Sequence, residues 1–190
     1  LTRAMLEASG LRAVAVGNTE VPLVAAIADP TVDVFVVEAS SFRLLHSERY
    51  APDVGTWLNL APDHLDNHAS LDAYTAAKAR IWADQRPDQI AIGNADDPVV
   101  AAHLAAAPAR HVTFGLSSAA DHRLVEDRLV LADGTTLAAV DELARHFPHD
   151  LANALAAAAS ALHGGGSAEG ARSALLAFRG LPHRVSLVGE

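Results

Sequence analysis

A single acidic residue, Glu38, closes the short run 33–38, in which the four residues before it are all apolar. Apolar runs of this length are typical of strands buried on both faces of a parallel sheet. Open α/β sheets bind ligands and metals at the carboxyl ends of such strands. Glu38 is therefore a candidate metal or ligand contact, and the alternative is an acid that simply meets solvent where its strand ends.

A polar segment, residues 59–68, follows a second predicted strand at 54–59 and contains Asp63, His64, Asp66 and His68. Aspartate oxygens and imidazole nitrogens suit a divalent metal ion. The segment is thus a second candidate metal site. The alternative is a polar loop that caps the neighbouring helix.

Lys78 is the only lysine among 14 basic residues. Base composition can explain the bias toward arginine, but a lysine can also supply a free amine, which arginine cannot. Tyr74 lies four residues earlier on the helix predicted over 70–84, with Ser70 as its N-cap, so the two side chains share a face. A nearby metal would disfavour the ammonium form of Lys78 and expose its amine for reaction.

Polar side chains in two later segments, at 150–153 and 183–184, could either contact a ligand or serve the structure alone. Asp150 is expected to cap the helix over 150–162, and Asn153 in its first turn could cap the helix or face a ligand. His183 and Arg184 follow a Gly-Leu-Pro turn, and the pair is either an anion contact or part of the surface.

Most of these residues follow or lie on predicted strands and helices that alternate along the first part of the chain. Apolar runs and helix boundary signals predict an α/β fold with a mostly parallel sheet covered by helices on both faces. The expected strands are 12–16, 33–38, 54–59 and 89–93, and the expected helices are 21–28, 70–84, 97–107, 150–162 and 167–178.

Short strands separated by turn signals replace this alternation after about residue 110. Four are predicted, at 111–114, 122–125, 128–132 and 135–140. We expect them to form a small antiparallel β flap inserted into the α/β body.

Composition excludes several classes of protein. The chain has 190 residues, a net charge of −9 and no cysteine. The charge disfavours nucleic-acid binding, and the lack of cysteine excludes disulfides and thiolate sites. Because no apolar run approaches the ~20 residues of a membrane span, we expect a soluble protein without membrane insertion. We also expect it to be cytoplasmic and monomeric.

The first ten residues form a predicted helix with no strand before it. In an α/β fold this order suggests that an upstream strand is missing. We therefore expect residues 1–190 to be one domain, truncated before Leu1.

Three motifs, taken in order, resemble the Mur ligases: Val36–Phe42, Asn59–His68 and Tyr74–Ile81. Gly17-Asn18 with Pro22, the segment 94–97 and the segment 178–184 also fit this family. The resemblance covers nearly the whole chain and is greatest to the members that add D-glutamate to UDP-N-acetylmuramoyl-L-alanine.

The resemblance implies the central, P-loop-ATPase-like domain of a three-domain enzyme. Its phosphate loop would lie upstream of Leu1, and its N-terminal UDP-binding and C-terminal domains would be absent. The implied reaction joins D-glutamate to the muramoyl substrate through an acyl phosphate made from ATP with Mg²⁺, in peptidoglycan precursor synthesis. The isolated fragment is expected to be inactive.

The resemblance also implies a role for each candidate residue. Glu38 and His64 would hold magnesium, joined by Lys78 after carbamylation. The muramoyl substrate would contact Asn18 and Ser40, with Arg43 beside them, and ATP would contact Asn153, Arg184 and Asp150.

Three positions depart from the family pattern: Glu20 where glycine is usual, Arg43 where glutamine is common, and Asp150 in place of asparagine. Aspartate offers no donor to a base, so that contact is the one most affected. Another Mur-type or folylpolyglutamate synthetase-like ligase is a second interpretation. A non-catalytic domain that keeps only the nucleotide-binding fold is a third.

Overall fold

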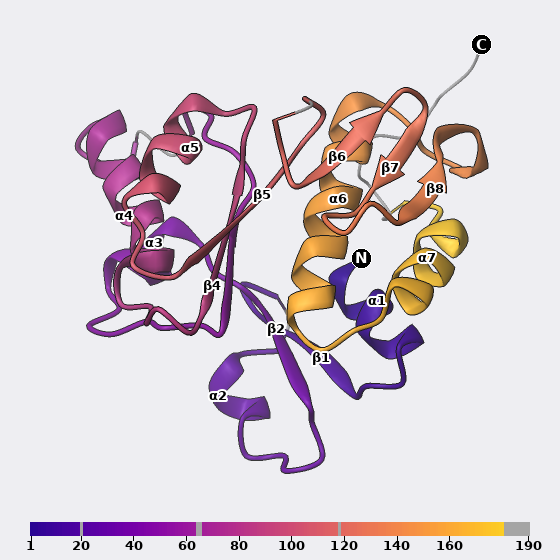
Figure 1. The fold of residues 1–190 in the computed structure, drawn as a ribbon. Helices are drawn as coiled ribbons and strands as arrows, with labels where there is room; N and C mark the ends of the chain where they lie inside the picture. The colour runs from indigo at the N-terminus through magenta and orange to yellow at the C-terminus, as the bar shows by residue number, and fades with distance from the viewer. Residues whose placement is uncertain (20, 64–65, 118, 181–190) are drawn as a thin grey trace.

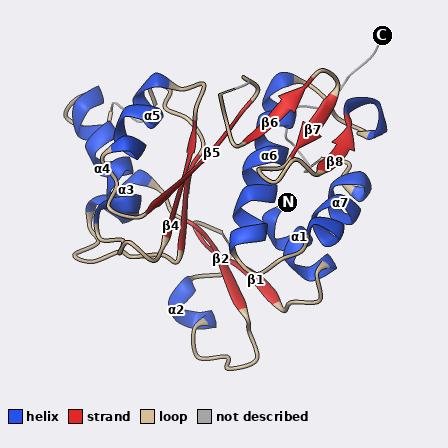
Figure 2. Cartoon of the chain, viewed as in Figure 1, coloured by secondary structure: helices blue, strands red, loops and turns tan. Residues whose placement is uncertain are grey.

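The computed structural model describes residues 1–19, 21–63, 66–117 and 119–180. Helices alternate with strands along most of the chain (Figures 1 and 2). The helices are α1 Thr2–Ala8, α2 Leu23–Ala26, α3 Ser41–Leu45, α4 Leu71–Ala83, α5 Pro98–Ala105, α6 Pro148–His163 and α7 Ala168–Ala177, with a 3-10 turn at Val140–Glu142. The strands are β1 Ala13–Gly17, β2 Val34–Glu38, β3 Val54–Trp57, β4 Ile90–Asn94, β5 Arg110–Gly115, β6 His122–Val125, β7 Arg128–Val130 and β8 Thr136–Ala139.

The strands form two sheets. β1 and β2 pair in parallel, with Gly17 opposite Glu38. The second sheet has the order β3-β4-β5-β6-β7-β8, parallel from β3 to β6 and antiparallel from β6 to β8. The predicted α/β class, with a mostly parallel sheet and a small antiparallel part, is confirmed.

Helices cover both faces of the larger sheet, as β4 shows directly. Successive side chains of a strand point to opposite faces. Ile92 joins the core cluster that contains α6, whereas Ala91 joins the cluster of Trp82 from α4 and Val100 from α5. Glycine at position 93 leaves room on this second face, since an added Cβ would lie 3.0 Å from Leu104.

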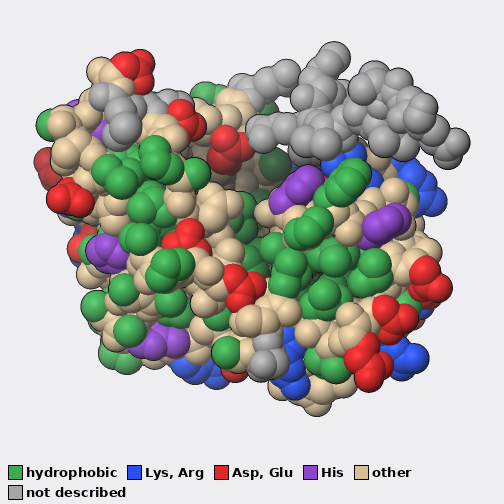
Figure 3. Space-filling model, turned by 90° about the horizontal axis from the view of Figure 1, so that it is seen from above, with side chains coloured by type: hydrophobic (Ala, Val, Ile, Leu, Met, Phe, Trp, Pro, Cys, Tyr) green, Lys and Arg blue, Asp and Glu red, His purple; other side chains and the backbone are tan. Residues whose placement is uncertain are grey.

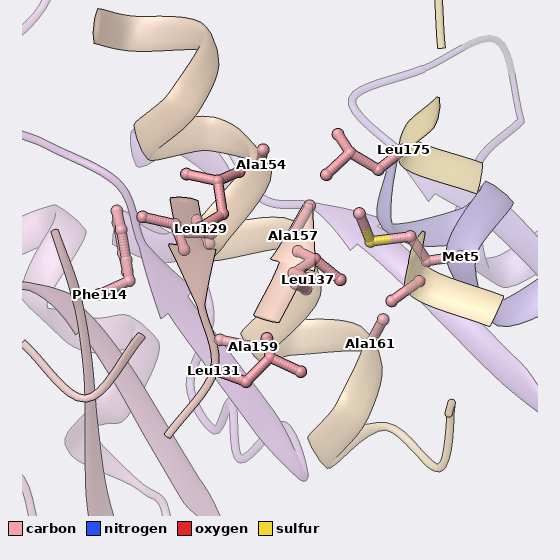
Figure 4. Close-up of a cluster of buried hydrophobic side chains, with 14 of the residues drawn as sticks. Met5, Phe114, Leu129, Leu131, Leu137, Ala154, Ala157, Ala159, Ala161 and Leu175 are labelled. Carbon is pink, nitrogen blue, oxygen red and sulfur yellow. The ribbon is translucent and has the colours of Figure 1, made fainter. Parts of the chain in front are cut away.

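The main core is built around α6. Its alanines are buried in a row, which lets the strands and α1 approach closely. Figure 4 shows α6 with Leu129 of β7, Leu137 of β8 and Met5 of α1 around it. Close-packed apolar contacts of this kind supply most of the favourable free energy of folding.

Three details differ from the sequence-based expectations. α6 begins at Pro148, so Asp150 lies inside the first turn rather than at the N-cap. Proline is favoured at this position because its φ is already helical and it has no N–H to leave unpaired. β5, assigned to the flap, pairs in parallel with both β4 and β6. A short helix, α3, follows β2 directly and was not predicted.

On the face seen from above, the side chains of the described residues form no large basic area (Figure 3). There, hydrophobic and acidic side chains occupy the centre, and the basic side chains lie toward the edges (Figure 3). Among the described residues, no helix is both long and apolar enough to cross a membrane.

Candidate functional site

A cavity of about 1240 Å³ lies between the two sheets, and we call it the inter-sheet cavity. β2 forms one wall and β3 another, and α6 and the start of α1 complete it. Among the described strands, none pairs with the second edge of either β2 or β3. Burial raises the pKa of Tyr50, one of the lining residues, because the cavity wall shields its hydroxyl from water.

Glu38 lies where β2 ends and lines this cavity. Its Oε1 accepts a hydrogen bond of 3.1 Å from Nδ2 of Asn18, which follows the neighbouring strand. Gly17 permits this approach: it has φ +104°, and a Cβ there would lie 2.5 Å from the Glu38 carbonyl oxygen. The structure therefore brings Asn18 and Glu38 together at the carboxyl end of the parallel pair. The strand-end position of Glu38 was predicted from the sequence and is confirmed, whereas its contact with Asn18 was not predicted.

Ser40 is the N-cap of α3, and Arg43 lies within this helix, shortly after Glu38. The Ser40 hydroxyl caps the helix by accepting from the Arg43 backbone N–H at 3.4 Å. The Arg43 side chain is exposed. The Ser40 cap thus fixes how the chain turns into α3, two residues after Glu38.

Lys78 lies on α4 and faces the end of β3. Its Nζ donates to the Asn59 carbonyl oxygen at 3.2 Å and lies 5.2 Å from the centre of the Tyr74 ring. The shared face predicted for Tyr74 and Lys78 is confirmed. The N-cap predicted at Ser70 is confirmed too, with its hydroxyl accepting from the Ala73 N–H.

Asp150 and Asn153 lie on the first turns of α6 and also line the inter-sheet cavity. Asp150 Oδ1 accepts from Arg145 Nε at 3.2 Å and lies 3.5 Å from His149 Nε2. Its other oxygen, Oδ2, is buried and has no partner among the described residues. An unpaired buried acceptor is costly unless a donor meets it, so this oxygen is suited to an N–H or O–H of a ligand.

Glu38, Asp150 and Asn153 therefore share one cavity, whereas Lys78 and Ser40 do not line it. His64 and Arg184 lie outside the described residues. Among the described residues, no three His, Asp or Glu side chains form a metal-binding group. The exposed carboxylate of Glu38 is nevertheless a hard oxygen donor at a strand end, which suits Mg²⁺.

Two features of this region were not predicted from the sequence. Arg145 and His149 flank Asp150, and only their closeness along the chain could have indicated the contact. The second feature is a buried pair, Ser41 and His68, whose Oγ and Nε2 lie 3.0 Å apart. Ser41 belongs to the motif Val36–Phe42 and His68 to the motif Asn59–His68. Because 27 positions separate the two residues, only the fold reveals their contact.

The Mur ligase middle domain is the family whose model matches this chain, over residues 1–161. The chain is 46% identical over 191 aligned residues to a UDP-N-acetylmuramoylalanine–D-glutamate ligase of Frankia casuarinae, covering 95% of the chain and 40% of the relative. It is 39% identical to the enzyme of the same name from Thermobifida fusca, covering 99% and 43%. The chain thus spans less than half the length of these relatives.

Solved structures share the fold at lower identity. A UDP-N-acetylmuramoyl-L-alanyl-D-glutamate–2,6-diaminopimelate ligase matches with a TM-score of 0.78 and 20% identity, covering the whole chain and 45% of that structure. A D-alanyl-D-alanyl ligase from Acinetobacter baumannii matches with a TM-score of 0.70 and 19% identity, covering the whole chain and 46% of that structure.

Proposed function

The chain belongs to the Mur ligase family, and we propose that it is the central domain of the ligase that adds D-glutamate to UDP-N-acetylmuramoyl-L-alanine. The observation that carries this proposal is the 46% identity over 95% of the chain to a relative of that name. The diaminopimelate and D-alanyl-D-alanine ligases resemble it in fold alone, at 20% identity or below. The D-glutamate reaction is therefore favoured over other amino-acid ligase reactions.

A phosphate-binding loop is expected upstream of Leu1 in the complete polypeptide. Among the described strands, none pairs with the second edge of β2 or of β3, and we call these the free edges. They support this expectation, because a parallel strand between them would join the two sheets. Leu1 and Thr2 line the same cavity as Glu38, so a loop leading into α1 would reach the carboxyl end of the sheet. Such loops hold nucleotide phosphates with backbone N–H groups.

The proposed reaction has two steps. A carboxylate oxygen of the muramoyl substrate forms a bond to the γ-phosphorus of ATP while the bond to ADP breaks. The amine of D-glutamate then attacks the acyl carbon, phosphate leaves with the electrons of the broken C–O bond, and the nitrogen releases one proton. Catalysis of phosphoryl transfer rests mainly on positioning and on neutralising negative charge.

The chain's own residues have distinct tasks in this scheme. Glu38 would hold Mg²⁺, which supplies positive charge beside the transferred phosphoryl group, and Asn18 orients the Glu38 carboxylate. Lys78, once carbamylated, and His64 would complete the metal ligands. A carbamylated lysine keeps one N–H, which can still donate to the Asn59 carbonyl oxygen.

Substrate contacts divide between the two sides of the site. Asn153, Asp150 and Arg184 would bind ATP. Asp150 Oδ2, which has no partner in the described part of the chain, supports a contact with a ligand donor, such as the amino group of adenine. Ser40, Arg43 and Asn18 would face the muramoyl substrate. Because ATP and UDP-linked sugars are intracellular metabolites, we place the enzyme in the cytoplasm, and we propose that it is monomeric.

The test is amide formation by the complete polypeptide. With ATP, Mg²⁺ and UDP-N-acetylmuramoyl-L-alanine, we expect D-glutamate to be incorporated with one phosphate released per product. L-Glutamate is the matched control and should not be incorporated. Residues 1–190 alone should be inactive. If the enzyme incorporates another amino acid in preference to D-glutamate, it is a ligase of another specificity. If it binds ATP without turnover, the non-catalytic interpretation is favoured.

A further inference from the structure

His68 lies at the centre of a buried cluster between α3 and α4. Only 5% of His68 and 5% of Ser41 is exposed, and His68 Nε2 lies 3.0 Å from Ser41 Oγ. The His68 ring stacks on Phe42 at 5.2 Å with an angle of 16°, and it packs on Tyr74 at 5.1 Å. Among the described residues, two aromatic rings and the Ser41 hydroxyl thus hold the imidazole.

This cluster links the residues that follow β2 to the helix that carries Lys78. Ser41 and Phe42 lie on α3, directly after Ser40 and three or four positions after Glu38. Tyr74 lies on α4, and its ring is 5.2 Å from Lys78 Nζ. A continuous series of contacts therefore runs from Ser41 through His68 and Tyr74 to Lys78.

A hydrogen-bonded serine and histidine could instead suggest a nucleophile and its base. Burial argues against this interpretation, because a nucleophilic hydroxyl must reach a substrate and Ser41 is nearly inaccessible. Ser40, by contrast, is partly exposed beside it. Ser41 is therefore suited to holding the backbone in place, and Ser40 is the serine that can contact a ligand.

We propose that His68 is a positioning residue: with Ser41 it fixes the start of α3 against α4, and so fixes Ser40 and Glu38 relative to Lys78. The roles given to Ser40, Glu38 and Lys78 rest on the proposed function. The series of contacts from Ser41 through His68 and Tyr74 to Lys78 does not depend on it. Groups that orient ligating and catalytic side chains commonly change activity ~10–100-fold when removed.

Kinetics of the complete enzyme test the catalytic consequence. His68→Phe keeps a ring for stacking but loses the hydrogen bond, and Ser41→Ala loses the same bond from the other side. Each should lower kcat ~10–100-fold, with KM for ATP little changed, because the proposed ATP contacts lie on α6. The double variant should be no worse than either single variant, since both remove one interaction.

Trp82→Phe is the matched control. Trp82 is also buried on α4 and donates to the Gly55 carbonyl oxygen at 2.8 Å, but it lies outside the cluster. It should lower Tm without lowering kcat. An equal loss of kcat in this control, or normal kcat in both His68→Phe and Ser41→Ala, would overturn the proposal.

A spectroscopic measurement tests the link without relying on turnover. Lys78 is the only lysine, so ε-¹³C-lysine gives one side-chain signal in the 190-residue chain. The Tyr74 ring should shift its Hε resonance upfield of free lysine, and Ser41→Ala should remove most of this displacement while Trp82→Phe keeps it. An unchanged signal in Ser41→Ala would overturn the link. A complete enzyme that fails to use D-glutamate would instead overturn the proposed function and leave this measurement valid.

Discussion

Gly170 of α7 lies in close contact with the C-terminal end of α1. A Cβ added at this glycine would lie 2.2 Å from Ser9 Oγ, 2.7 Å from the Ser9 backbone nitrogen and 2.9 Å from the Ala8 carbonyl carbon. Ordinary contacts between carbon atoms are about 3.5–4.0 Å. Two of the three neighbours are backbone atoms, so rotation of a side chain cannot relieve the overlap. Gly170→Ala must therefore push the two helices apart by roughly 1 Å.

The cost can be assembled from its parts. Overpacking of this kind costs about 1–3 kcal/mol. Ser9 Oγ donates to the Met5 carbonyl oxygen at 2.7 Å and accepts from the Ser167 N–H at 3.0 Å, and losing either bond adds about 1 kcal/mol. Alanine recovers about 1 kcal/mol through its higher helix propensity. We expect Gly170→Ala to lower the free energy of unfolding by roughly 2 kcal/mol.

Urea unfolding followed by circular dichroism measures this change. Ser173 is exposed on the same helix, so comparing Ser173→Ala with Ser173→Gly gives the propensity contribution alone. The double variant Ser9→Ala/Gly170→Ala removes only the overlap with Ser9 Oγ, and the overlaps with the two backbone atoms remain. It should therefore regain only part of the lost free energy of unfolding. If Gly170→Ala is as stable as the parent or more stable, α1 and α7 do not pack as closely as described, and the reasoning fails.

Three further outcomes follow from the structure. His122 is 3% exposed, its ring nitrogens have no hydrogen-bond partner among the described residues, and burial followed by the nearby His163 lowers its pKa below 6.5. The unfolded chain therefore binds the proton first as pH falls below 6.5, and stability should fall by up to ~1.4 kcal/mol per pH unit. Unfolding measured from pH 7 to 5 should show a shallower slope for His122→Phe but not for the exposed control His46→Gln. Trp82→Phe should cost about 1–3 kcal/mol in urea unfolding, because the Gly55 carbonyl oxygen loses a buried donor, and an unchanged midpoint would contradict that bond. Adding the upstream polypeptide should slow amide exchange in β2 and β3 but not in β7, and equal exchange with and without it would show that nothing pairs with their free edges.

Local signals in the sequence predicted several elements well. Ser70 has the chemistry of an N-cap and occupies that position, and Pro98 opens α5 as proline commonly does. Glu38 was placed at a strand end because the apolar run before it is short and uninterrupted. These features depend on residues close together in the chain, which is why they could be predicted.

The remaining features depend on contacts between distant segments. Pro148 is itself a local signal for the start of a helix, but the sequence favoured Asp150 as the N-cap, and the two signals lie only two residues apart. The parallel pairing of β5, by contrast, depends on β4 and β6 rather than on its own residues. The Ser41–His68 contact joins α3 to the loop before α4. The inter-sheet cavity likewise depends on distant segments, because β2 and β3 both line it but belong to different sheets.

The role of Lys78 is the most direct test of the proposed ligase site, measured as kcat of the complete enzyme. If Lys78 is carbamylated and helps to hold Mg²⁺, both Lys78→Ala and Lys78→Arg should lose most activity, because arginine keeps the charge but cannot become a carboxylate ligand. Acetate should partly restore Lys78→Ala by occupying the vacated ligand position, and it should not restore Lys78→Arg. Near-normal turnover by Lys78→Arg would show that Lys78 is only a solvated charge on α4 and would contradict the account.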